Sequence, residues 1–317
     1  MPFKSDRLLG NYKLPANEIK TTENYSKVSI TSLDINNVQH KIEQEEKHIE
    51  VYATIPSSVN TINHIKIFLE ALSISLGKYL HPILLLTVDP KTRTAIIYSN
   101  EQNNSSKKLW SPLPQQQLYQ AKNLNTLITQ YINTINEPLA PMCGYWYRVF
   151  DDSTSHIENQ ALTLTTCIEG ILKEYFYELG LPDQNYIKLL EDAINKLQTN
   201  NIGIDSRVLT KIITSAKNAN QFTIKEALTK LKDINILTQY HLKIWNKIRN
   251  KSHHADILNN NSEDIEKYYT QINTCLEILY IIIFYHIKYE GEYTQYSEDG
   301  WPTSYFDKEK KKHQSPL

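Results

Sequence analysis

Apolar and polar positions along the first 140 residues indicate a mixture of strands and helices. Strands are expected where apolar and polar side chains alternate, or where short apolar runs end at turn residues. These strands are predicted at 28–33, 48–55, 83–88 and 94–98, with a turn at 89–91 between the last two. Ser58 and Asn60 offer caps to a helix that ends before Pro82, and a second helix is predicted at about 118–135.

The pattern changes after 138–141, because downstream apolar residues recur every three or four positions, as on the buried face of a helix. Helices are predicted at 156–179, 205–216, 234–249 and 262–289, with shorter ones after the caps Asp183 and Thr223. No strand is expected in this half. The chain is therefore predicted to be mainly α: an α+β N-terminal domain (1–140), an all-α helical bundle (141–300) and a flexible basic tail (301–317).

Charge and cysteine content narrow the classes of function. Lys and Arg number 34 and Asp and Glu 35, so a net charge of −1 gives no global positive field for nucleic acid. Cys143, Cys167 and Cys275 form no CxxC or Cys/His metal spacing, which is typical of a reducing cytosol. No signal-peptide pattern opens the chain. The most apolar segment, 276–287, is too short to cross a bilayer and is predicted to be a buried helix. We expect a cytoplasmic protein without a membrane segment.

The stretch from Trp245 to Ala255 carries the most specific chemical pattern in the chain. Arg249, Asn250 and His254 match the pattern Arg-Asn-x-x-x-His, which resembles the Arg-x(4–6)-His motif of HEPN superfamily nucleases. The motif follows an amphipathic helix, precedes a long final helix and lies late in an all-helical segment. This context strengthens the resemblance and implies a HEPN-type helical bundle.

A wider resemblance covers roughly residues 150 to 300. An α+β region, a helix such as 161–169 and then the Arg-Asn-x-x-x-His segment look like ApeA-type defence proteins, and the ending at 287–296 is similar to theirs. The resemblance implies an RNA-cleaving effector of phage defence or abortive infection. It also implies a homodimer through the helical domain, or a HEPN partner, with two motifs facing across a shared groove. Glu169 matches the acidic position of the first HEPN helix, where it can hold the arginine or tune the histidine; a surface or inter-helix salt bridge is the equal alternative.

These residue types suit metal-independent RNA cleavage. A histidine titrates near neutral pH, so His254 can act as general base or acid for the attack of the 2′-OH on the adjacent phosphate. The always-protonated guanidinium of Arg249 suits the charge that gathers on the phosphate oxygens. Asn250 would orient a phosphate or the imidazole. The expected products carry a 2′,3′-cyclic phosphate and a 5′-OH, DNA is excluded because it lacks the attacking hydroxyl, and no metal or other cofactor is needed.

Helix geometry leaves the choice of histidine open. At about 100° per residue, an unbroken helix places His254 roughly 140° from Arg249, whereas His253 would lie only about 40° away. His254 therefore converges with Arg249 only if the helix breaks or reorients near 250–252. The family spacing favours His254, and a continuous helix would favour His253.

The remaining candidates have simpler alternatives. Lys247 and Lys251 are candidate RNA contacts, and Trp245 could stack on a base, although core or interface packing is the commoner role of such a residue. The pair His253-His254 lacks the spacing of a metal site, and the sequence has no GxxxxGK[ST] or GxGxxG motif. The rival hypothesis is a non-catalytic HEPN-like module that binds RNA or protein, which the near-zero net charge favours.

Overall fold

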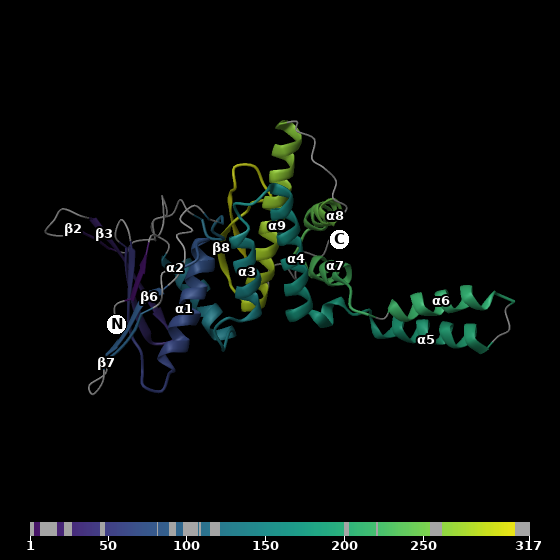
Figure 1. Ribbon diagram of the computed structural model, residues 1–317, viewed down its shortest axis with the longest axis horizontal. Helices are drawn as coiled ribbons and strands as arrows, with labels where there is room; N and C mark the ends of the chain where they lie inside the picture. Colours follow the sequence, from purple (N-terminus) through teal and green to yellow (C-terminus); the bar gives the residue numbers. More distant parts are fainter. Residues whose placement is uncertain are drawn as a thin grey trace.

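A computed structural model describes residues 3–6, 18–21, 27–44, 48–80, 82–88, 93–97, 107, 109–114, 121–199, 203–219, 221–253 and 262–307. A β-sheet with a covering helix occupies one end of the molecule, a helical bundle the middle, and a helical hairpin projects from the other end (Figure 1). The predicted class, an α+β part followed by helices and mainly α overall, is confirmed.

The N-terminal sheet is antiparallel throughout the described residues. Its strands are β1 (Phe3–Asp6), β2 (Glu18–Thr21), β3 (Lys27–Ile35), β4 (Val38–Gln44), β5 (His48–Thr54), β6 (Pro82–Val88) and β7 (Arg93–Ile97), in the order β2-β3-β4-β5-β1-β6-β7. Asn36 and Asn37 join β3 to β4 with positive φ angles of 52° and 63°, the conformation that a two-residue hairpin turn requires. Along β4 buried and exposed residues alternate, so one face packs on the core.

Helix α1 (Thr61–Leu76) covers the sheet and is buried along most of its length. The predicted cap is confirmed, since the side chain of Asn60 accepts a hydrogen bond from the Asn63 backbone N–H. Phe68 of α1 stacks on His40 of β4 with ring centroids 4.5 Å apart, which ties the helix to the sheet. Gly77 ends the helix in the left-handed region.

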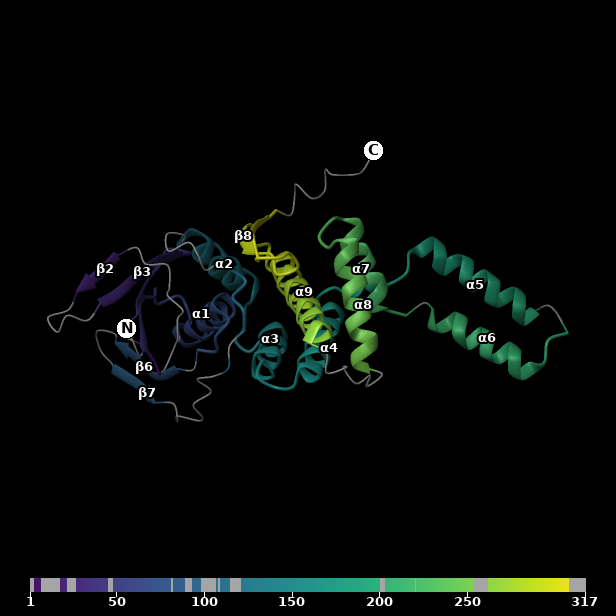
Figure 2. The same ribbon diagram turned by 90° about the horizontal axis from the view of Figure 1, so that it is seen from above.

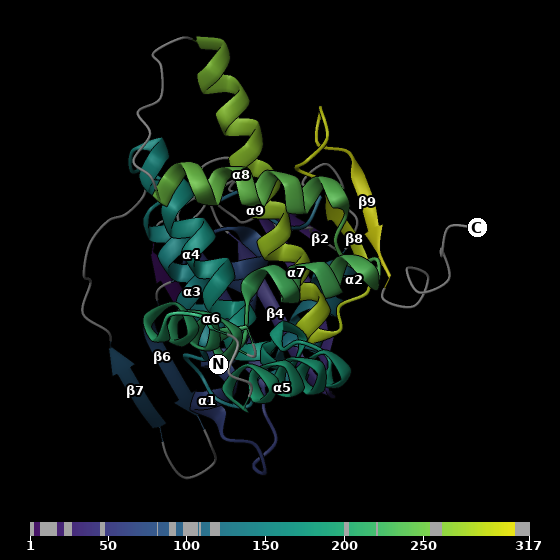
Figure 3. The same cartoon turned by 90° about the vertical axis from the view of Figure 1, so that its right-hand side faces the viewer.

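The helical part and the sheet share one continuous hydrophobic core. Its elements are α2 (Ala121–Thr134), α3 (Pro141–Asp151), α4 (Ile157–Tyr175), the 3₁₀ turn η1 (Tyr177–Gly180), α5 (Gln184–Thr199), α6 (Ser206–Asn218), α7 (Ile224–Asp233), α8 (Gln239–His253) and α9 (Ser262–Ile287). Helix α8 lies across α4 and α9 (Figure 3). The predicted caps Asp183 and Thr223 each accept backbone N–H bonds at the start of α5 and α7.

Helix α9 is the central element of this core, and the prediction that its apolar end is a buried helix is confirmed. Residues 278–284 are all 1% exposed or less. By length and composition α9 could cross a membrane, but 78% of its most apolar stretch is buried inside the protein, as in the core helix of a globular domain.

The prediction of no strands after residue 140 is wrong. Strands β8 (Gly291–Thr294) and β9 (Thr303–Phe306) form an antiparallel hairpin that returns to α2. Each strand has four residues, too few for a clear alternating pattern, and Phe306 is fully buried against the ring of Phe284 in α9. Helix α3 was also not predicted, because its aromatic residues are typical of strands. Residues 308–317, most of the predicted basic tail, lie outside the described residues.

Candidate functional site

The candidate site begins with the amphipathic pattern of α8. Leu242, Trp245 and Ile248 recur at three-residue spacing and are buried against α4 and α9, while Lys247 and Asn250 face solvent. This pattern fixes the rotation of α8 about its axis. It therefore places Arg249 at the border between the buried and exposed faces, half-buried.

The structure brings together Arg249 and Glu169, which lie 80 positions apart in the sequence. The Nε–H of Arg249 donates to Oε1 of Glu169 at 3.0 Å, and the contact joins α8 to α4. The two side chains are 41% and 23% exposed, so solvent reaches the pair. The expectation that Glu169 holds the arginine agrees with this contact.

The backbone of α8 bears on the choice of histidine. The helix continues through Asn250, Lys251 and Ser252 and ends at His253, so the break near 250–252 that would turn His254 toward Arg249 does not occur there. His253 is four positions after Arg249 on a continuous helix, about 40° away around the axis. His254 lies outside the described residues. Reorientation of His254 would have to begin after His253.

The structure separates the supporting candidates. Lys247 and Asn250 are exposed on the solvent side of α8, about 160° and 100° around the helix from Arg249. The Lys251 ammonium lies 4.8 Å from the centre of the Tyr268 ring in a cation–π contact. The hypothesis that Trp245 stacks on a base is contradicted, because the side chain is only 3% exposed and belongs to the core. Its place on the same face as Leu242 and Ile248 explains this burial.

A buried pair that sequence reasoning missed holds the start of α8. The His241 Nδ1 accepts the Thr238 backbone N–H at 3.2 Å, so the proton of the neutral ring lies on Nε2, 3.5 Å from Oε1 of Glu277. The other oxygen of Glu277 accepts the Ser297 N–H at 2.6 Å. Glu277 was missed because it lies within the most apolar stretch of α9.

Other chemistries find little support in the described part of the chain. Burial raises the pKa of the Cys167 thiol to about 11 and raises those of Cys143 and Cys275 further, so all three stay protonated. No group of three or more His, Cys, Asp or Glu side chains in the described residues is placed to hold a metal.

A cavity of about 310 Å³ lies between α3, α4 and α9, bordered by Trp110 and Tyr269. The α4 residues that line it, Gln160 and Leu164, lie roughly 140–180° around the helix from Glu169, so it opens away from the ion pair. The described residues that line this cavity are uncharged.

Comparisons with protein-family models, curated proteins and solved structures found no match.

Proposed function

We propose that this chain is a metal-independent endoribonuclease of the HEPN type. The observation that carries the proposal is the contact between Arg249, in the motif that resembles the family, and Glu169 on a separate helix. The acidic partner lies 80 residues away in the sequence, at the position that the resemblance indicates.

The contact supports catalysis by orienting a charged donor before RNA arrives. A free arginine side chain has many rotamers, and the bond from Nε to Glu169 restricts them while the guanidinium stays within reach of solvent. A donor that is fixed in advance stabilises charge on a transition-state phosphate better than one that must be ordered during the reaction. Arg249 is proposed to bind the non-bridging oxygens of the scissile phosphate.

The proposed reaction needs no outside reactant for the cleavage step. The 2′-oxygen attacks the adjacent phosphorus and the bond to the 5′-oxygen breaks, which leaves a 2′,3′-cyclic phosphate and a 5′-OH. His254 takes the 2′-OH proton or gives a proton to the leaving oxygen, and His253 is the alternative because it shares the Arg249 face of α8. A homodimer would supply one motif from each chain. Asn250, Lys247 and Lys251 are proposed to contact RNA.

The biological setting of this proposal follows from the resemblance alone. A ribonuclease of the ApeA-like kind would cut host or invader RNA during phage infection, in the cytoplasm. The N-terminal sheet would then serve as the sensing part. These proposals are independent of the proposed cleavage chemistry and need their own tests.

Two observations favour the second candidate, a non-catalytic module that binds RNA or protein. Glu169 already neutralises Arg249, and Trp245, a candidate base platform, is buried in the core. In that case the ion pair would serve to hold α8 against α4, and the chain would bind its partner without cleaving it.

Cleavage of labelled single-stranded RNA in EDTA tests the proposal. The wild type and the variants Arg249→Ala, His253→Ala and His254→Ala are compared with Lys243→Ala, which removes an exposed cation six residues before Arg249 and about 120° from it around α8. We expect cyclic phosphate ends from the wild type and Lys243→Ala, and loss with Arg249→Ala and one histidine variant. RNA binding without cleavage by every protein, or equal cleavage by all of them, would overturn the nuclease proposal.

A further inference from the structure

The helices α5 and α6 form a hairpin that projects from the rest of the molecule (Figure 1, Figure 2). They are amphipathic, with 16 and 13 residues, close to the length of about 12–15 residues below which isolated helices are marginal in water. Ile194 is the one fully buried residue of α5 within its described helix, and α6 has none. The hairpin therefore lacks much of the packing that usually stabilises such helices.

Each helix carries two adjacent apolar stripes. The inward stripe joins α5 to α6 and consists of Ile187, Leu190, Ile194, Leu209 and Ile213, which are buried or half-buried. The second stripe is exposed: Tyr186 and Leu189 on α5 are 46% and 68% exposed, and Val208 and Ile212 on α6 are 50% and 39% exposed. Four large apolar side chains on one small element are more than scattered surface residues.

The exposed stripes of the two helices lie on the same face of the hairpin. At 100° per residue, each exposed stripe lies roughly 90° around its helix from the inward stripe. In both helices this rotation runs from an inward residue toward the residue that precedes it in the sequence. The displacement has the same rotational sense about each helix axis. Because α5 and α6 run antiparallel, equal rotations turn both stripes to one side. The opposite side carries Glu191, Asn195, Thr210, Thr214 and Lys217, which are all exposed and polar.

We propose that this apolar face, defined by Tyr186, Leu189, Val208 and Ile212, binds the same face of a second copy of the chain to form a four-helix bundle. A two-fold axis between two such layers generates an antiparallel bundle from two identical hairpins. Each copy would supply the apolar surface that the other lacks. This proposal does not depend on nuclease activity, because it concerns a different element.

Charge favours one of the two ways to stack the hairpins. Helix α6 carries Arg207, Lys211 and Lys217 but no acidic residue, whereas in α5 Glu191 and Asp192 balance Lys188 and Lys196. Stacking α6 on the partner's α6 would oppose like charges, so α6 should lie on the partner's α5. Asp192 and Lys211 are both near the middle of their helices and on the outer edges, where they would meet across this interface.

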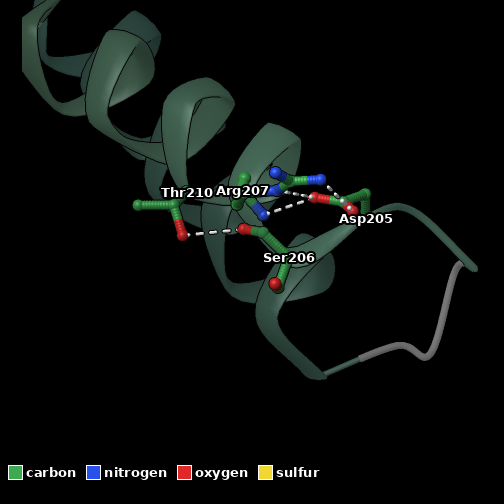
Figure 4. Close-up of polar contacts among 4 residues, drawn as sticks. All are labelled: Asp205, Ser206, Arg207 and Thr210. Carbon is green, nitrogen blue, oxygen red and sulfur yellow. Dashed lines mark hydrogen bonds and ion pairs between the residues drawn. The ribbon is translucent and has the colours of Figure 1, made fainter.

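Arg207, at the start of α6, is engaged within its own chain (Figure 4), so the proposed contact uses Lys211. Arg207 is already paired with Asp205, which also caps the helix by accepting the Arg207 backbone N–H at 2.9 Å. Thr210 bonds back to the Ser206 carbonyl at 2.8 Å, on the polar side. Neither Asp192 nor Lys211 forms an ion pair within the described part of the chain.

The dimer should be weak. A 16-residue helix is about 24 Å long, and neighbouring helices lie about 8–10 Å apart, so the face measures on the order of 500 Å². Stable complexes bury about 800 Å² on each partner. We therefore expect a dissociation constant in the micromolar range, visible as a mass that rises with protein concentration.

Analytical ultracentrifugation of the full chain tests the proposal. Leu189→Glu and Val208→Glu place charges on the apolar face, and Asn195→Glu and Thr210→Glu are matched controls on the polar side of the same helices. We expect at least tenfold weaker association for the first pair and unchanged association for the second. Far-ultraviolet circular dichroism confirms that each variant keeps its helices.

A charge exchange tests the arrangement of the hairpins. Asp192→Lys and Lys211→Asp should each weaken the dimer, and the double variant should restore it, because each new lysine then faces a new aspartate of the partner. A wild type that stays monomeric at several hundred micromolar overturns the proposal. So does a dimer that face and control variants alter equally. A double variant that stays weak overturns the stacking of α5 on α6.

Discussion

Removal of the Arg249 side chain is expected to cost little folding stability and much activity. The ion pair with Glu169 includes a 3.0 Å bond from Arg249 Nε to Glu169 Oε1, and its side chains are 41% and 23% exposed. Partly exposed pairs of this kind contribute about 0.2–1 kcal/mol to folding, because water competes for both charges. A donor that stabilises transition-state charge is worth about 10²–10³ in rate.

The two roles separate in a double-mutant cycle. Urea unfolding of the wild type, Arg249→Ala, Glu169→Gln and the double variant gives the coupling free energy of the pair, which we expect to be below about 1 kcal/mol. RNA cleavage by the same four proteins gives the loss of activity. Arg249→Ala should lose at least about 100-fold, and Glu169→Gln should lose less, since it orients the guanidinium but does not touch the phosphate.

A coupling free energy above about 2 kcal/mol would refute this reasoning. The pair would then mainly stabilise the packing of α8 on α4, and any loss of cleavage in Arg249→Ala would follow from unfolding. Lys243→Ala, on the exposed side of α8, supplies the baseline for removal of a cation from this helix.

Further predictions concern stability. Burial and the nearby His64 lower the pKa of His40 from 6.5 to about 4. Between these pH values the unfolded chain takes up a proton that the folded chain does not, so the free energy of unfolding should fall by up to about 3 kcal/mol as the pH drops from 6.5 to 4. His40→Gln should flatten that dependence in acid titrations of urea unfolding. Gly144→Ala, in α3 with open space around the added Cβ, should stabilise by about 0.5–1 kcal/mol. Gly77→Ala should destabilise, because the residue has φ 63° and its added Cβ would clash with the Leu109 carbonyl oxygen; thermal melts that reverse this order would contradict the packing. Trp245→Ala should lower the free energy of unfolding in urea by about 3–5 kcal/mol. A loss below about 1 kcal/mol would contradict the burial of Trp245 in the core.

Much of the fold follows from local sequence patterns. The caps at Asn60, Asp183 and Thr223 were recognisable because a short polar side chain precedes each apolar-periodic segment. Helix α9 was recognisable from its length and apolar content. The α3 helix was not, because Tyr145, Trp146 and neighbouring aromatics favour strands locally and become helical through packing on α4.

The candidate site was predictable in part. Arg249 and Glu169 could be paired only through the resemblance, since no local pattern links residues 80 positions apart. Trp245 was assigned both a core role and a stacking role, and the helical face shared with Leu242 could have decided for the core. Glu277 gave no signal, because a buried carboxylate is recognised by its partners in space and not by its neighbours in sequence.

The measurement that tests the central claim most directly is cleavage of an RNA with one 2′-deoxy nucleotide, placed on the 5′ side of a mapped cleavage position, in EDTA. If Arg249 and its histidine promote attack by the 2′-OH, cleavage at that position should disappear while neighbouring positions are still cut, and the remaining products should end in 2′,3′-cyclic phosphate. Continued cleavage at the deoxy position would contradict the account, because the attacking group would then come from elsewhere.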